Sequence, residues 1–499
     1  MNDSPARRSR IASLWRAFLR PVEPDARRTV AEAWDRLAPE LRVDHQAIGR
    51  QEEGCGATIG LMPRCDFGCT GCYLGTGANT AEAVSLDEIK GQMRLLREHL
   101  AIWGNLQLTD GEVLLRPVGE IIELLKYARR IRLVPMIMTH GDHFRRQPGL
   151  LEQLMVEGGM VELSIHIDTT QRGRLGERYR HARREAELMP LRDEFAGMIR
   201  AVRARTKLPL RVASTVTVTR DNLVEVGDIV RWFVRNADAF RLVSFQPAAQ
   251  VGRTRSGLGG AVEPDELWRE IHRGVNRDRT GPPIDTTNVW WFGHSDCSRL
   301  ITGLVAGQAG APDRFELVGM AGQPIDRRFL DGFLRRWGGI SFRADDRAHI
   351  AWRVLGMVRQ HPRYCLGTLP RFGWSLLRRL DRDRPARLLA RLITRRARVS
   401  PFTIGSHHFM SAAQIATPRG RQRLENCIFT VPVHGEIVPM CQVNAGLRDR
   451  FYARTLTTNG VRDDVSLPPG SRRVGNPGDP LGVSAAPHPD AEPPCRQRD

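Results

Sequence analysis

Short apolar runs alternate with amphipathic helical segments between about residue 57 and residue 248. Most of these runs are apolar at nearly every position, which is typical of strands that are buried on both faces of a parallel sheet. The alternation of such strands with helices predicts a parallel α/β fold. The predicted strands are residues 57–63, 105–110, 134–140, 161–168, 211–218 and 240–247.

Helical periodicity separates the predicted strands, and several of the helices are preceded by Asp, Ser or Asn, which favour helix starts. Six strand–helix units of this length are typical of a partial or closed barrel. We therefore predict a parallel-stranded, partial (β/α)6 TIM-like barrel that binds its ligands at the carboxyl ends of the strands. The predicted helices begin near Leu86, Val118, Pro148, Leu188 and Val224.

The pattern changes on both sides of this barrel. Residues 1–54 are expected to form a basic helical extension, and we place the barrel core at residues 55–253. Residues 265–453 are mixed in pattern and rich in Trp and Arg, and we expect a smaller C-terminal α+β domain there. Residues 463–499 are rich in Pro, Gly, Asp and Arg, and this composition predicts disorder.

The chain carries a formal net charge of +19, to which arginines along the whole length contribute. Two interpretations stay open: a solvated basic surface, or attraction to an anionic partner such as lipid headgroups, phosphates or nucleic acid. Residues 374–398 mix leucines with arginines, and Pro385 is predicted to divide them into two helices. Basic amphipathic helices of this kind, also expected in residues 7–20, either lie on a membrane surface or pack against a core.

No membrane-spanning helix is predicted, because no uncharged apolar run reaches about 18 residues. The N-terminus is basic, but Arg16 interrupts its apolar part and no small-residue cleavage site follows. It therefore does not have the pattern of a secretory signal. We expect a cytoplasmic protein, with peripheral contact at the inner face of the membrane if the basic helices bind lipid.

Three of the nine cysteines, Cys65, Cys69 and Cys72, fall on one loop after the first predicted strand. Their C-x3-C-x2-C spacing lets three thiolates converge on one metal centre, and thiolates are the usual ligands of iron–sulfur clusters. A structural zinc site generally takes four ligands from two C-x2-C pairs, and the sequence has no second pair. The pattern favours a [4Fe–4S] cluster in which one iron has no protein ligand.

This loop resembles that of radical S-adenosylmethionine (SAM) enzymes, whose signature is C-x3-C-x-aromatic-C, with a core similar to that of the molybdenum-cofactor-biosynthesis members. The resemblance implies that SAM chelates the open iron. It also implies that an electron donor such as flavodoxin or ferredoxin drives cleavage of SAM to a 5′-deoxyadenosyl radical. Gly71 stands where the family has its aromatic residue, and Tyr73 follows the third cysteine instead. Tyr73 is therefore the candidate for adenine contact.

The second predicted strand ends in Thr109-Asp-Gly-Glu112, which resembles the family's Gly-Gly-Glu motif. Asp110 replaces the first glycine, whereas Gly111 and Glu112 match. The resemblance implies that Gly111 and Glu112 position the methionine ammonium group of SAM.

The fourth predicted strand places Ser164, His166 and Asp168 on one face, because side chains alternate along a strand. An interior row of polar residues is costly without partners. Two interpretations remain: the row holds the nucleoside of SAM, as the resemblance implies, or it faces a water-filled barrel mouth. Thr215 and Asn222, in and after the fifth strand, resemble further family positions.

The second half of the chain offers candidates for an auxiliary iron or iron–sulfur site. Cys427 and Cys441 bracket a stretch, IFTVPVHGEIVPM, that resembles half of an auxiliary-cluster extension, and Cys297 is the best third ligand. Isolated cysteines are otherwise small buried hydrophobes, and that alternative stays open. Further residues that would complete the site are Cys55, Cys365, His294, His407 and His408.

These features predict a radical SAM enzyme, an oxidoreductase or transferase, that modifies an unactivated carbon of a small molecule or a lipid. A short similarity over residues 409–444 to radical SAM enzymes that modify membrane lipids favours a lipid. Modification of a peptide or protein is the alternative. A zinc-stapled, basic nucleic-acid-binding protein would explain the charge and the cysteines, but not the Gly-Glu strand end or the α/β order. Nucleic acid is therefore not expected as a partner.

Overall fold

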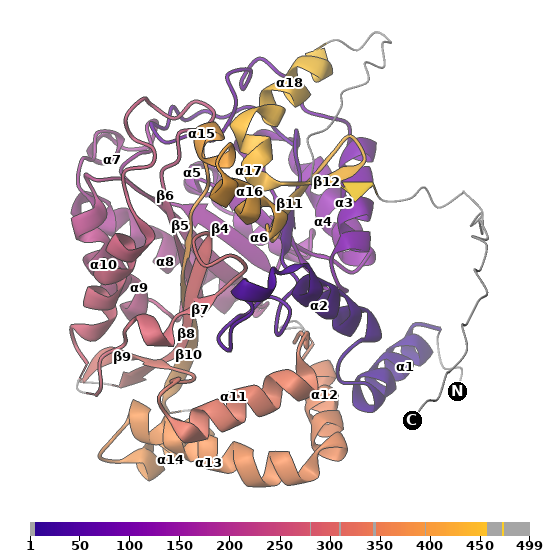
Figure 1. Cartoon of the computed structure of the whole chain (residues 1–499), viewed down its shortest axis with the longest axis vertical. Helices are drawn as coiled ribbons and strands as arrows, with labels where there is room; N and C mark the ends of the chain where they lie inside the picture. Colours follow the sequence, from indigo (N-terminus) through magenta and orange to yellow (C-terminus); the bar gives the residue numbers. More distant parts are fainter. Residues whose placement is uncertain are drawn as a thin grey trace, which may run out of the picture.

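One sheet forms the centre of the protein, and helices cover its outer face (Figure 1). The computed structural model describes residues 5–279, 281–308, 311–342, 346–394, 396–456 and 472–473. The 13-stranded sheet has the order β13-β12-β11-β1-β2-β3-β4-β5-β6-β10-β8-β7, and β9 pairs with β8. The predicted fold class, a partial parallel α/β barrel, is confirmed. The predicted disordered tail lies outside the described residues, apart from β13 (Arg472–Arg473).

The first six strands lie side by side in chain order and are all parallel, as expected when a helix joins each strand to the next. The register pairs Ser164 with Ala213, and Ser214 with Val243. The strand bounds are β1 (Cys55–Ala57), β2 (Asn105–Leu108), β3 (Val134–Thr139), β4 (Glu162–His166), β5 (Arg211–Val218) and β6 (Leu242–Pro247).

The crossover helices pack their apolar faces on the outside of these strands. In α9, Val226, Ile229, Val230 and Phe233 are buried at helical spacing. At the start of α3, the Ser85 hydroxyl accepts a hydrogen bond from the Glu88 N–H (3.2 Å). The helix bounds are α3 (Leu86–His99), α4 (Val118–Arg130), α5 (Asp142–Arg146), α6 (Leu150–Val156), α7 (Glu177–Arg180), α8 (Met189–Thr206), α9 (Val226–Arg235) and α10 (Pro264–Asn276).

The first strand was predicted in the wrong place: β1 covers Cys55–Ala57, whereas the apolar pattern predicted residues 57–63. Beyond β1, side chains take hydrogen bonds that a neighbouring strand would otherwise make. The Asp110 carboxylate accepts one from the Gly60 N–H (2.6 Å). Gly60 also has a φ of 75°, which ends the extended conformation. The apolar run is buried, but most of it is not a strand.

The predicted C-terminal domain, residues 265–453, adds strands to both edges of the core sheet. β10 pairs in parallel with β6, and β11 pairs in parallel with β1. A common apolar core includes Phe245 from the barrel and Phe402 from this segment, so the sheet is continuous across the expected boundary. The strand bounds are β7 (Trp290–Trp291), β8 (Ser298–Gln308), β9 (Ala311–Leu317), β10 (Arg398–His407), β11 (Phe429–Val433) and β12 (Glu436–Pro439).

Further helices lie at the two ends of the sheet. In Figure 1, α11 to α14 lie beneath the sheet, next to α1, and α15 to α18 lie at the opposite end. The predicted division at Pro385 is confirmed, because α14 begins there. Among the described helices, none is long and apolar enough to cross a membrane. The bounds are α1 (Pro5–Leu19), α2 (Pro24–Arg36), α11 (Pro324–Trp337), α12 (Arg347–Gln360), α13 (Pro362–Leu380), α14 (Pro385–Ile393), α15 (Ala412–Ile415), α16 (Pro418–Glu425), α17 (Met440–Gln442) and α18 (Arg448–Leu456).

Candidate active site

The three predicted cluster ligands lie on the long loop between β1 and α3, which we call the cluster loop (residues 58–85). Backbone hydrogen bonds fix this loop against the segments that follow β4 and β6. The Thr70 N–H donates to the Thr170 carbonyl (2.9 Å), and the Arg255 N–H donates to the Thr70 carbonyl (2.7 Å). The loop therefore lies at the carboxyl ends of the parallel strands, where α/β barrels bind their ligands.

The thiols of Cys65, Cys69 and Cys72 converge near one guanidinium. Arg253 lies 3.5 Å from the Cys72 sulfur. Burial would lower the pKa of Arg253, but Cys72 first, and then Cys65 and Cys69, outweigh burial and raise it. Burial raises the pKa of Cys65 to about 12, and Glu112, Asp66 and Cys72 add to the effect. Thiols that bind a metal centre release their protons when it binds.

Gly111 and Glu112 join the end of β2 to the cluster loop. Gly111 has a φ of 66°, and an added Cβ would clash with the carbonyl oxygens of Met62 and Arg64. The Glu112 N–H donates to the Arg64 carbonyl (2.8 Å). The buried Glu112 carboxylate accepts hydrogen bonds from the Thr139 hydroxyl (2.6 Å) and from the N–H of His140 (2.9 Å), which follows β3. Its predicted contact with SAM stays a prediction.

Asp110, which replaces a glycine of the family motif, anchors the C-terminal helix. It is fully buried, forms an ion pair with Arg448 and accepts a hydrogen bond from the Tyr452 hydroxyl (2.8 Å). The Arg448 guanidinium lies 5.0 Å from the centre of the Tyr73 ring. The Tyr73 hydroxyl is 2.9 Å from the Thr109 hydroxyl, and burial raises the pKa of Tyr73 to about 12. Tyr73 thus lies in this buried polar group, and its contact with adenine stays a prediction.

The polar row of the fourth strand is brought together only in part. Ser164 is buried on β4, and its hydroxyl is 3.4 Å from the Thr215 hydroxyl. His166 Nε2 is 2.5 Å from Asp168 Oδ2 and 3.0 Å from the Thr217 hydroxyl. Asp168 follows the strand; burial would raise its pKa, but His166 and hydrogen bonds from Thr170 and Thr217 hold that pKa well below its usual range. His166 and Asp168 therefore act as a hydrogen-bonded pair.

His140 was not found from the sequence. Its ring stacks on Phe67 of the cluster loop, with ring centroids 3.7 Å apart and planes 3° apart. His140 Nε2 lies 2.8 Å from Asp66 Oδ1 and 3.2 Å from Glu112 Oε2. In the sequence, His140 is the last residue of the predicted strand 134–140, and this position alone did not mark it as a site residue. His140 links the cluster loop to the ends of β2 and β3.

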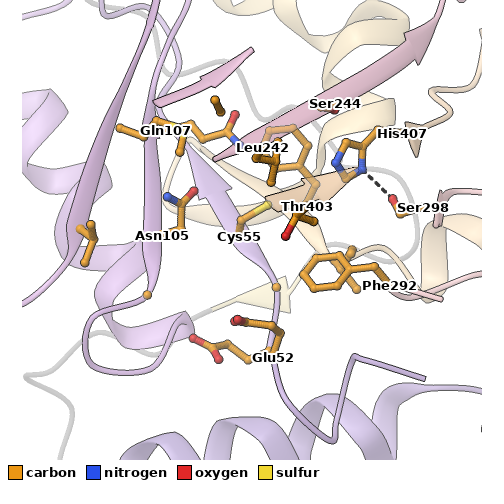
Figure 2. Close-up of a pocket in the computed structure, with 18 of the residues that line it drawn as sticks. Glu52, Cys55, Asn105, Gln107, Leu242, Ser244, Phe292, Ser298, Thr403 and His407 are labelled. Carbon is orange, nitrogen blue, oxygen red and sulfur yellow. Dashed lines mark hydrogen bonds between the residues drawn. The ribbon is translucent and has the colours of Figure 1, made fainter. Parts of the chain in front are cut away.

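A cavity of about 710 Å³ lies inside the half-barrel, within the range of small-molecule sites (Figure 2). Alternate residues of the core strands line it, as expected from the two-residue repeat of a strand. Gln107, Ser244 and Thr403 come from strands β2, β6 and β10, so both the core and the C-terminal segment build the wall. Ser244 Oγ is buried and has no hydrogen-bond partner within the described part of the chain.

Charged groups gather at the amino-terminal ends of the strands. Glu162 of β4 forms an ion pair with Arg211 of β5 and accepts a hydrogen bond from Asn105 Nδ2 (2.8 Å). Glu52 lines the cavity and is surrounded by protein. The resulting loss of water, and then the nearby Glu53 and Glu162, raise the pKa of Glu52 to about 8. The cavity therefore has a charged end and, further along the strands, walls of mixed character.

The three predicted auxiliary ligands, Cys297, Cys427 and Cys441, all line this cavity, and so does Cys55. Burial raises the pKa of Cys427 to about 12, and its neighbours Cys297 and Cys55 contribute. Burial also raises the pKa of Cys441, and the neighbouring Cys427 and Cys297 raise it further. Cys365 lies elsewhere, in a separate apolar cluster of the helices beneath the sheet.

The histidines considered with these cysteines differ in their surroundings. His294 Nε2 is 3.3 Å from the Gln422 amide oxygen, and His294 Nδ1 accepts a hydrogen bond from the Asp296 N–H (3.1 Å). His407 Nδ1 is 2.8 Å from the Ser298 hydroxyl, as the dashed line in Figure 2 shows. Burial lowers the pKa of His408 to about 3, so this imidazole is neutral.

Residues 59–232 match the model of the radical SAM superfamily. A relative is the 7,8-dihydro-6-hydroxymethylpterin dimethyltransferase of Methanocaldococcus jannaschii, with 26% identity over 200 residues. The match covers 40% of this chain and 37% of the relative, so it does not compare the whole proteins. The superfamily implies a [4Fe–4S] cluster and SAM as cofactors, and it favours an enzyme over a zinc-stapled nucleic-acid-binding protein. Residues 59–232 therefore form a radical SAM domain.

Proposed function

We propose that Cys65, Cys69 and Cys72 bind a [4Fe–4S] cluster and that SAM occupies the space between the cluster loop and the cavity. The observation that carries this proposal is the course of β5. Thr215 lines the cavity, and Thr217, two residues further on, contacts His166 and Asp168. A Cβ on Gly71 of the cluster loop would lie 3.3 Å from Thr217 Cγ2. Cofactor site and cavity therefore share one face of this strand.

The residues present fit these cofactors. Three converging thiols beside Arg253 are the donor set of an iron–sulfur cluster with one open position. When bound, the cluster and SAM supply a 5′-deoxyadenosyl radical, which removes a hydrogen atom from an unactivated carbon. A flavodoxin or ferredoxin is the proposed source of the electron. Either electron donor would approach the strand ends that carry the cluster loop.

The protein's own residues orient the nucleoside and the amino acid part of SAM. Thr139 and His140 orient Glu112 by hydrogen bonds, so that its carboxyl group lies at the end of β2, where an ammonium group would be bound. His166 is partly exposed, and Asp168 fixes the orientation of its ring through Nε2. Ser164 offers a hydroxyl at the boundary with the cavity. These roles are the ones expected for Gly111, Glu112, Ser164, His166 and Asp168.

Substitution of one cluster ligand tests the proposal. The Cys69→Ala protein is expected to lose the iron and sulfide of this cluster and to form 5′-deoxyadenosine only at background rate, because a thiolate is removed. Both quantities are measured on anaerobically purified, chemically reduced protein. Cys365→Ala is the matched control, since Cys365 lies in another part of the molecule. Formation of 5′-deoxyadenosine by Cys69→Ala at the parent rate would exclude the assignment.

For the substrate we propose a lipid, or another amphipathic molecule with a polar end. Apolar side chains such as Met136, Leu242 and Phe292 line the cavity, whereas Glu52 and Arg211 lie at its amino-terminal end. A charged end, with apolar side chains further along the mixed walls, suits a headgroup with a chain. A peptide or protein side chain is the alternative, and the pterin named for the relative would engage the polar residues instead. Deuterium transfer from a labelled substrate to 5′-deoxyadenosine separates these classes.

We also propose an auxiliary iron or iron–sulfur site on Cys297, Cys427 and Cys441, with Cys55 next to them. All three thiols line the cavity, and Cys297 raises the pKa of both Cys427 and Cys441. The Arg423 Nε–H donates to the Cys297 sulfur (3.1 Å), so a cation already accompanies this thiol. A metal centre here would lie beside the substrate.

Iron content tests the auxiliary site separately from the SAM-binding cluster. The Cys427→Ser/Cys441→Ser protein is expected to hold less iron per chain than the parent, while it still forms 5′-deoxyadenosine without substrate. The matched control is Cys365→Ser, another buried cysteine. Iron and sulfide equal to the parent in the double variant would show that these thiols bind no iron.

A further inference from the structure

Four helices beneath the core sheet, α1, α12, α13 and α14, contact one another in that order, and we call them the basic layer (Figure 1). Trp15 and Phe18 of α1 pack against Trp352 of α12, with ring centroids 5.3 Å and 5.7 Å apart. None of the four helices contains Asp or Glu. The layer is therefore positively charged along its whole length.

On α13, apolar and basic side chains share one exposed face. Leu366, Leu369 and Trp374 are exposed at spacings of three and five residues, and Arg363 and Arg371 are exposed beside them. Leu366 is 72% exposed, and because Leu369 and Trp374 are exposed on the same face, it belongs to an apolar patch. Covering such a face with apolar material removes it from water and is therefore favourable.

The neighbouring helices also expose apolar side chains. α14 buries Leu388 but exposes Leu389 and Ile393, the latter by 73%. α12 exposes Val354 and Leu355. Outside the basic layer and α11 with its connection to α12, the large exposed apolar side chains of the described chain are Leu115, Val156, Leu175, Leu208 and Val224. The exposed apolar surface is therefore concentrated on one part of the molecule.

We infer that the basic layer docks on the anionic face of a lipid bilayer. Arginines beside exposed Leu, Ile and Trp are the pattern of helices that lie in the membrane interface, where guanidinium groups pair with headgroup phosphates. The positive charge of the four helices favours an anionic partner. The exposed apolar side chains on α1, α12, α13 and α14 favour a partner that also has an apolar interior. A bilayer containing anionic lipid meets both conditions.

The basic layer also borders the cavity. Ile340, Ser341 and Phe342, in the connection from α11 to α12, line the cavity together with Ile350 of α12. Ile340 lies close to the charged end, because Gln51 Nε2, next to Glu52 in the chain, donates to its carbonyl (3.5 Å). A lipid at the docked surface would therefore lie beside that end of the cavity. This last step rests on the proposed lipid substrate, whereas the docking itself does not.

Sedimentation of the full chain with vesicles tests the docking. Vesicles of phosphatidylcholine alone are compared with equimolar phosphatidylcholine and phosphatidylglycerol. The parent protein is expected to sediment with the anionic vesicles and not with the neutral ones. Replacing Arg363, Arg371 and Arg378 by Gln is expected to weaken this binding on the order of a hundredfold, because each exposed arginine near an anionic surface contributes.

The apolar contribution is tested with a matched pair of variants. Leu366→Glu/Ile393→Glu is expected to lose vesicle binding, whereas Val156→Glu/Val224→Glu, which changes two exposed apolar residues elsewhere, is expected to keep it. Equal losses in the two variants, or no binding of the parent to anionic vesicles, would overturn the inference. A parent dimer that Leu366→Glu converts to monomer, without vesicle binding, would show a second copy on this face and would also overturn it.

Formation of 5′-deoxyadenosine without lipid is measured in each protein and is expected to be unchanged. Vesicle binding without 5′-deoxyadenosine formation in the parent would refute the proposed function and leave the docking in place.

Discussion

Gly111 has a backbone reason for being glycine that does not depend on any cofactor. Its positive φ and the nearby carbonyl oxygens of Met62 and Arg64 leave no room for a side chain. From the sequence, this glycine was singled out only through a resemblance. His140 shows the opposite case, because no pattern identified it and yet it stacks on Phe67 and contacts Glu112. Contacts between strand ends and a distant loop leave no periodic signal in the sequence.

The Gly111→Ala protein is expected to be less stable than the parent by about 2 to 5 kcal/mol, the combined cost of a left-handed alanine and of overpacking. Urea unfolding followed by circular dichroism measures this loss. Gly119→Ala is the control, since a Cβ there meets no atom within 4 Å. Equal stability of the two variants would contradict the steric explanation.

Among the elements, β5 was predicted with its observed bounds, because residues 211–218 form a buried run with both faces covered. The misplaced β1 shows the limit of this reasoning. The apolar residues of the predicted strand, residues 57–63, are buried. However, the Ile59 and Gly60 N–H groups donate to the side chains of Gln92 and Asp110 rather than to a neighbouring strand. Periodicity reports burial, and it does not report which group accepts a hydrogen bond.

Asp110 ties α18 to the end of β2, and one substitution tests how much this link stabilises the protein. Arg448→Gln is expected to cost about 3 to 5 kcal/mol, because the buried Asp110 carboxylate loses its counter-charge. Chemical unfolding measures the cost, and the added change Asp110→Asn is expected to restore part of it. Arg450→Gln, on the exposed side of the same helix, serves as the control. A loss as small as that of the control would mean that the ion pair is dispensable.

At the scale of the whole molecule, the α/β order of residues 57–248 was enough to predict a parallel half-barrel. The addition of β10 and β11 to its two edges was not predictable, since strand pairing between distant segments has no local pattern. The cavity follows from that pairing. Cys55 and Cys297 are distant in the chain from Cys427 and Cys441, and all four line the cavity only in the folded protein. The sequence named Cys297, Cys427 and Cys441 as the best candidate ligands and Cys55 as a further one, but it did not show that they line one cavity.

The pairing of β11 with β1 and of β10 with β6 has a consequence for synthesis on the ribosome. While the C-terminal strands are still untranslated, the nascent barrel has two unpaired edges, and such edges promote association between chains. The wall that carries Cys55 is completed only after Cys441 has been translated. Iron delivered to the growing chain would therefore meet the thiols of the cluster loop long before it meets a finished second site.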